Sequence, residues 1–84
     1  MNDDILLAIL LSIQDDLATN NKTKKSIISN INEYVIWLQT STDLFGKEYE
    51  KYKLILSSIL YNLVHDDIVQ AKNDLDSYIK SLMQ

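Results

Sequence analysis

The residues best suited to chemistry are His65, Asp66 and Asp67, where the only histidine of the chain precedes two carboxylates. Imidazole and carboxylate groups serve as metal ligands and as general acids or bases. A metal site needs three or four convergent ligands, however, and consecutive residues on a helix point in different directions. We therefore interpret this triplet as a polar junction between two helices, in which an aspartate caps the second helix.

Other routes to catalysis lack the necessary residues. Ser57 and Ser58 could act as nucleophiles only with His65 as their base, and they lie about two turns from it within an apolar stripe. The absence of cysteine excludes a thiol nucleophile and a Cys-based zinc site. Gly46 is the only glycine, which excludes a glycine-rich nucleotide loop. We predict a protein that is not an enzyme and has no catalytic residue, cofactor or metal.

The charge of the chain excludes further classes of partner. Twelve acidic residues and eight basic ones give a net charge of −4, and every basic residue is a lysine. Duplex-binding proteins present a basic face with arginines, so we expect no nucleic-acid partner. The longest strongly apolar run covers residues 5–11, far fewer than the roughly 20 residues that a membrane span needs. We therefore also expect no membrane insertion.

Trp37 and Ile36 are the candidate contacts with a protein partner. Successive residues of a helix are rotated by about 100°, so Ile36, Trp37 and Leu38 cannot all face the core. Exposed tryptophan is a frequent anchor of binding surfaces, and the alternative is a half-buried residue at the edge of the core. Lys24 and Asp16 are candidate charged residues at the rim of the same surface.

Four amphipathic segments must position these residues. The chain has 46% hydrophobic and 24% charged residues, which supports a packed domain, while one glycine and no proline leave little turn chemistry for hairpins. Apolar residues recur at helical spacing over 3–18, over 24–39, from a start between 43 and 47, and over 68–83. We predict a single all-α domain over 1–84 that forms an antiparallel four-helix bundle with short loops.

The third and fourth segments are separated by a change in the phase of the apolar stripe. The third stripe includes Phe45 and Tyr52, and a new stripe starts at Val64. Asp67, followed three residues later by Gln70, resembles a capping box and so marks a new helix. The alternative is one bent helix over 47–83, which would give three helices. Thr23 is the candidate cap of the second segment.

The first and third segments carry more apolar residues than one core-facing stripe requires. Leu7 and Leu11 lie beside the first stripe, and Leu54 lies beside the third. The tyrosines, by contrast, are expected in the core with their hydroxyls in water: Tyr49, Tyr52, Tyr61 and Tyr78. An exposed apolar surplus marks a partner surface or a self-association face. We predict a protein-binding module of inhibitor, immunity or antitoxin type; the alternative is a homo-oligomeric structural or assembly protein, such as a homodimer.

One stretch of the chain resembles a known family. Residues 45–59 carry a phenylalanine, then an acid, then a helical apolar stripe: Phe45-Gly46-Lys47-Glu48, followed by Tyr52, Leu56 and Ile59. This pattern resembles the small helical class II bacteriocin immunity proteins of the enterocin A immunity type. Asp4-Ile5-Leu6, with Leu10 and Leu17, is a looser match to an early helix of the family, and the two stretches together cover about a third of the chain. The chain departs from the family in being shorter and acidic and in keeping a full helix after residues 45–59. The resemblance implies a four-helix bundle that guards a membrane receptor from a pore-forming peptide.

Composition predicts the kind of organism that encodes the protein, and the first residues of the chain predict where the protein is located. Abundant Asn, Lys, Ile, Ser and Tyr are typical of an AT-rich genome and indicate a low-GC bacterium, its phage or a plasmid. Met1 is followed by Asn2, Asp3 and Asp4, whose charge is wrong for the first region of a signal peptide. We therefore expect a cytoplasmic protein.

Overall fold

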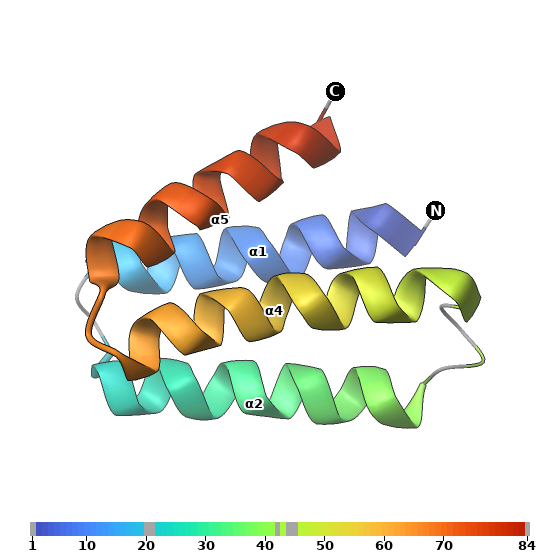
Figure 1. Ribbon diagram of the computed structural model, residues 1–84, viewed down its shortest axis with the longest axis horizontal. Helices are drawn as coiled ribbons and strands as arrows, with labels where there is room; N and C mark the ends of the chain where they lie inside the picture. The colour runs from blue at the N-terminus through green and yellow to red at the C-terminus, as the bar shows by residue number, and fades with distance from the viewer. Residues whose placement is uncertain (1, 20–21, 42, 44–45, 84) are drawn as a thin grey trace.

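The computed structural model describes residues 2–19, 22–41, 43 and 46–83. Within them the chain forms four long helices and one short 3-10 helix: α1 (Asn2–Thr19), α2 (Lys24–Thr40), η1 (Gly46–Glu48), α4 (Tyr49–Val64) and α5 (Ile68–Met83). The described residues contain no strand, and the long helices pack into one antiparallel bundle (Figure 1). The predicted all-α four-helix bundle is confirmed.

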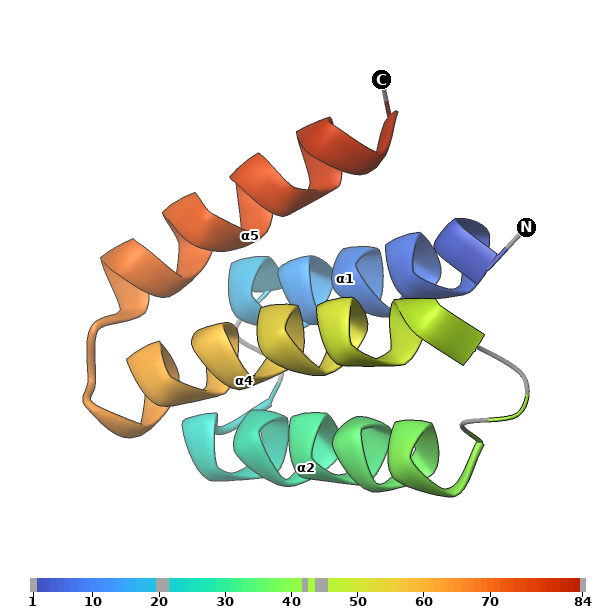
Figure 2. The same ribbon diagram turned by 45° about the vertical axis from the view of Figure 1, so that its right-hand side comes forward.

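The four long helices form a ring around one core. Successive helices run in opposite directions, so the start of α1 and the end of α5 lie at the same end of the bundle (Figure 1). α1 packs against α2 and α5, and α4 packs against the same two helices. Toward its C-terminal end, α5 leans away from α1 in both views (Figures 1 and 2). The distance between α1 and α5 therefore increases toward the C-terminal end of α5.

Each helix contributes one apolar stripe to the core. The buried residues of the described chain are Leu6, Ile9, Leu10, Ile13, Leu17, Ile27, Ile31, Leu38, Tyr52, Ile55, Leu56, Ile59, Leu63, Ala71, Leu75 and Ile79. No charged or polar residue is buried among the described ones. Since full burial of a large aliphatic side chain contributes about 1.5–3 kcal/mol, this stripe packing is the main source of stability. The predicted stripes account for most of these positions.

Two predictions about the end of α4 are wrong. Tyr61 is 63% exposed instead of buried, and Val64 is exposed instead of starting the stripe of α5. Tyr61 lies two residues from both Ile59 and Leu63, which are buried. Two residues correspond to about 200° around a helix, so a side chain at position 61 must point away from the core. Phe45, the first member of the predicted third stripe, lies outside the described residues.

The break between α4 and α5 is a tight C-terminal cap. Asp66 adopts a left-handed backbone with φ of 60°. Its N–H donates to the Leu63 carbonyl at 3.1 Å, and the N–H of Asp67 donates to the Asn62 carbonyl at 2.8 Å, which is the Schellman pattern. Separate third and fourth helices are therefore confirmed, and the single bent helix is wrong.

Side chains cap the starts of α2 and α5. Thr23 Oγ1 accepts a hydrogen bond from the Ser26 N–H at 3.1 Å, and Asp67 Oδ1 accepts one from the Gln70 N–H at 3.2 Å. Both caps agree with the sequence prediction. In a capping box the Gln70 side chain would also accept a hydrogen bond from the Asp67 N–H. Here that N–H donates to the Asn62 carbonyl, and the Gln70 side chain donates to Asp74 Oδ1 at 2.7 Å. The start of α5 is thus capped by Asp67, and Gln70 instead links two turns of the helix.

Candidate binding groove between α1 and α2

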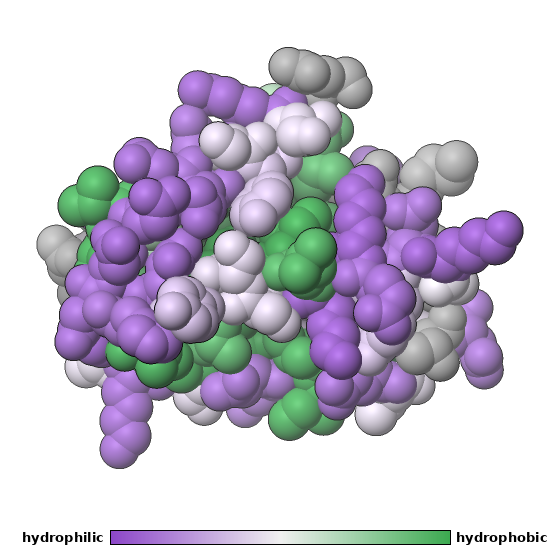
Figure 3. Space-filling model, in the orientation of Figure 1, coloured by the Kyte–Doolittle hydropathy of each residue, from purple (hydrophilic) through white to green (hydrophobic). Residues whose placement is uncertain are grey.

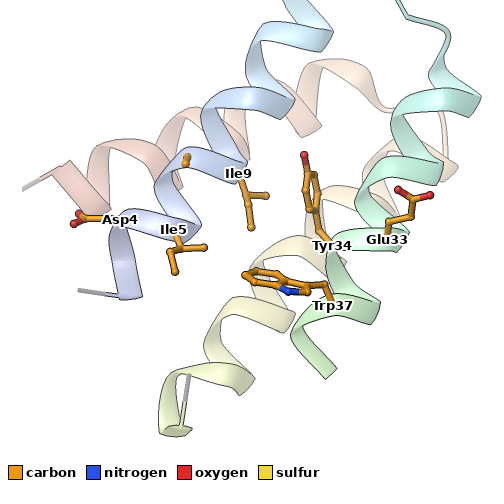
Figure 4. Close-up of a pocket in the computed structure, with 7 residues that line it drawn as sticks. Asp4, Ile5, Ile9, Glu33, Tyr34 and Trp37 are labelled. Carbon is orange, nitrogen blue, oxygen red and sulfur yellow. The ribbon is translucent and has the colours of Figure 1, made fainter. Parts of the chain in front are cut away.

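An open groove lies between the N-terminal half of α1 and the C-terminal half of α2 (Figure 4). It encloses about 600 Å³ and is lined by Asp4, Ile5, Ala8, Ile9, Glu33, Tyr34 and Trp37. Ile5 and Ile9 form one wall, while Tyr34 and Trp37 form the other (Figure 4). A groove of this size falls within the range of about 300–1,000 Å³ that small-molecule pockets occupy.

The helical period explains why these residues share the groove. Ile5 and Ile9 are four residues apart on α1, and Tyr34 and Trp37 are three apart on α2, so each pair lies on one face of its helix. Between the two isoleucines, Ala8 carries only a methyl group and leaves space beside α2. The groove therefore results from two short apolar walls and one small residue.

The groove is apolar inside and acidic at its edges. Ile9 is buried and Tyr34 is half-buried, whereas Trp37 remains 39% exposed. Asp4 and Glu33 are exposed and lie at opposite edges, on α1 and α2 respectively (Figure 4). The walls can bind apolar groups by removing them from water. The lining includes no histidine among the described residues.

The structure distributes the four predicted contact residues over three locations. Trp37 lines the groove, while Ile36 is 58% exposed and does not line it. Lys24 begins α2, thirteen residues before Trp37. That spacing corresponds to about 20 Å along a helix axis. Lys24 and Asp16 therefore do not rim the surface that contains Trp37.

Lys24 and Asp16 lie instead together in a smaller hollow at the opposite end of α2. This hollow encloses about 170 Å³ and also includes Lys22 and Lys72. Asp16 forms an ion pair with Lys22, with 3.4 Å between Oδ2 and Nζ, and Lys24 pairs with Asp66. Ion pairs between such exposed groups contribute about 0–1 kcal/mol. The first pair links α1 to the residues before α2, and the second links the start of α2 to the junction between α4 and α5.

Sequence reasoning missed the residues that do rim the groove. Glu33 lies four residues before Trp37, and this spacing places both on one face of α2, so the sequence contained a signal for it. Asp4 carried no such signal. It reaches the groove only because α1 packs beside α2, which no local pattern reports.

The His65–Asp67 triplet forms the polar junction expected of it. The His65 ring stacks on the Tyr61 ring with 4.1 Å between centroids, and Asp67 caps α5. Within residues 2–19, 22–41, 43 and 46–83, no three histidine or acidic side chains are placed to hold a metal ion. The stacking of His65 and the cap formed by Asp67 give the triplet a structural role at the junction of α4 and α5.

Exposed apolar side chains also lie on the outer side of α4. Leu54 is 71% exposed, and Tyr61, two turns later, lies on the same side of the helix. Val64 is also exposed near the end of α4. On the face of the molecule shown in Figure 3, apolar side chains form small groups separated by polar ones. Exposed apolar side chains therefore lie both in the groove between α1 and α2 and on the outer side of α4.

No protein-family model, curated protein or solved structure matches this chain. In the described part of the chain, no helix combines the length and the hydrophobicity that crossing a membrane requires.

Proposed function

We propose that this chain is a non-enzymatic protein-binding module that engages its partner through the groove between α1 and α2. The observation that carries this proposal is the placement of Trp37, half in the groove and half in water, opposite Ile5 and Ile9. Tryptophan and tyrosine are enriched among residues that dominate binding energy. An apolar segment of a partner would gain affinity by displacing water from these walls.

Within this class we propose an inhibitor, immunity or antitoxin role in the cytoplasm of a low-GC bacterium or its phage. The resemblance of residues 45–59 to class II bacteriocin immunity proteins supports this role. A small acidic chain whose main feature is an apolar groove also fits a protein that acts by covering part of another protein. The partner would then be blocked physically, without a chemical step.

The test compares two neighbouring residues of α2. Peptides selected by display on the purified chain would be titrated against the wild type, Trp37→Ala and Ile36→Ala. We expect Trp37→Ala to weaken binding at least 30-fold, because loss of a central anchor costs about 2 kcal/mol or more. Ile36→Ala should change affinity less than about 2-fold, because surface substitutions away from the contact have small effects. Equal affinities for the two variants would contradict the proposal.

A second candidate function is that of a homo-oligomeric structural or assembly protein. The specific observation in its favour is the exposed outer side of α4, with Leu54, Tyr61 and Val64. Leu11 adds an exposed apolar side chain on α1. The mass of the protein in solution and the peptide titrations together separate this candidate from the first.

A further inference from the structure

The groove between α1 and α2 has the size and the lining of a small-molecule site. Its volume of about 600 Å³ lies within the range that such sites occupy, and the space between the helices of a bundle is one of their usual locations. Ile9 is buried in one wall, and the Trp37 ring extends from α2 toward Ile5 (Figure 4). A ligand would therefore lie between aliphatic side chains on α1 and aromatic rings on α2.

The groove is smaller than a protein interface. Each wall spans about one helical turn, from Ile5 to Ile9 on α1 and from Tyr34 to Trp37 on α2. A stable interface includes about 20–30 residues on each side, whereas seven described residues line the groove. A protein partner or a second copy must therefore also contact residues outside the groove. A compact molecule with a few rings would fit between the walls alone.

The charges around the groove favour a neutral ligand. None of the eight lysines is among the described residues that line it, so an anion would lose its water there without meeting an opposite charge. Asp4 already takes part in an interaction within the chain, which leaves Glu33 as the carboxylate that could attract a cation. Glu33 is exposed, and a single exposed carboxylate contributes little attraction. The lining therefore selects for apolar surface and not for charge.

We infer that the groove binds a small, neutral aromatic molecule. Its rings would pack against Tyr34 and Trp37 in stacked or edge-to-face contacts, while Ile5 and Ile9 cover the opposite side. The affinity comes from removing the apolar surface of the ligand and of the partly exposed Trp37 from water. This inference goes beyond the proposed function, because it requires no protein partner. Since both concern the same groove, the molecule and a protein partner would compete.

Two fluorescent probes with the same rings test the inference. Phenylnaphthylamine is neutral, whereas anilinonaphthalene sulfonate carries a negative charge on that ring system. We expect the neutral probe to bind about 10-fold more tightly, because the sulfonate meets no cation in the groove. Trp37 is the only tryptophan, so its indole N–H gives a single NMR signal, which should shift as the neutral probe is added. Tighter binding of the sulfonate, or an indole signal that does not move, would overturn the inference.

Two alanines of α1 provide a matched pair of variants. Ala8 lines the groove, whereas Ala18 lines a second hollow of about 280 Å³ between α1 and α5. Both alanines are exposed, so we expect leucine at either position to leave the thermal unfolding of the protein nearly unchanged. Ala8→Leu fills the groove and should weaken binding of the neutral probe at least about 10-fold, while Ala18→Leu should change it less than about 2-fold. Equal affinities in the two variants would place the probe outside the groove and overturn the inference.

The peptides that test the proposed function distinguish its failure from that of the inference. If those peptides require Trp37 but the neutral probe does not bind, the inference is wrong and the proposed function stands. If Ala8→Leu abolishes binding of the probe while the peptides bind Trp37→Ala as well as the wild type, the inference stands and the proposed function is wrong. If both ligands depend on the groove, the probe should displace the peptides. Simultaneous binding would then mean that the probe lies elsewhere and would overturn the inference.

Discussion

Asp66 shows how one residue separates two helices. It is one of two described residues with positive φ; the other is Gly46, at 56°. The left-handed region brings the Cβ of an L residue close to the following carbonyl, although aspartate tolerates it better than most residues. This conformation lets Asp66 and Asp67 donate to the last carbonyls of α4. Local strain at Asp66 therefore produces a sharp end to α4 and the return of the chain along α5.

We expect glycine to be preferred over alanine at position 66. Asp66→Gly should be more stable than Asp66→Ala by about 1 kcal/mol in urea denaturation, because glycine adopts the left-handed region without a clash. Both variants lose the ion pair with Lys24, so this loss cancels in the comparison. Ser29 is an exposed position within α2, and there Ser29→Ala should be more stable than Ser29→Gly by about 1 kcal/mol. Alanine as the better residue at both positions would contradict the left-handed cap.

Single residues also show what the sequence could predict about the site. The angle of about 100° between Leu38 and Trp37 predicts that Trp37 leaves the centre of the core, and its partial exposure confirms this. The same argument could not say which neighbouring helix Trp37 would meet. Ile5 and Ile9 supply the opposite wall from α1, and that contact depends on packing between helices. The separation of Lys24 and Asp16 from the groove follows from packing in the same way.

At the scale of the helices, boundaries are largely local and therefore predictable. α5 begins and ends at the residues that the sequence predicts, and α2 continues one residue beyond its predicted end. Thr23 and Asp67 make the capping hydrogen bonds that fix the two starts. The third helix differs, because the described chain enters it through η1 before α4 begins at Tyr49. Periodicity could not resolve this entry, because the three residues of η1 are too few to distinguish 3.0 from 3.6 residues per turn.

Two isoleucines of α2 test the orientation of that helix. Ile31 is completely buried, whereas Ile36 is 58% exposed. Ile31→Ala should lower the free energy of unfolding by about 2–5 kcal/mol, because it leaves a cavity in the core. Ile36→Ala should change it by less than about 0.5 kcal/mol. Thermal and urea denaturation measure both, and similar losses in the two variants would mean that α2 is rotated relative to the structure.

The whole molecule combines a small core with apolar groups left outside it. A chain of this length buries only about 60–65% of its unfolded surface, and this one has no cysteine to form a disulfide. Stability therefore depends on the sixteen buried residues that the four long helices supply. The sequence predicts that stripe on each helix, yet the lean of α5 and the opening between α1 and α2 arise only when all four helices pack together.

We expect the protein to be a monomer near 9.7 kDa across a range of concentrations and salt levels, as measured by light scattering behind a sizing column. The exposed apolar face of α4 rests on three side chains, Leu54, Tyr61 and Val64. A stable interface buries about 800 Å² on each partner, more than such a small face supplies. Leu54→Lys should therefore leave both the mass and the fold unchanged, because Leu54 is 71% exposed.

A dimer that resists salt and dissociates in Leu54→Lys would contradict this expectation and assign α4 to self-association. Because no described residue of α4 lines the groove, such a dimer could still bind a partner there, and the peptide titrations would decide. A dimer that ignores Leu54→Lys but is lost in Trp37→Ala would challenge the proposed function more strongly. The groove would then be filled by a second copy, and the apolar walls of α1 and α2 would serve assembly instead of recognition.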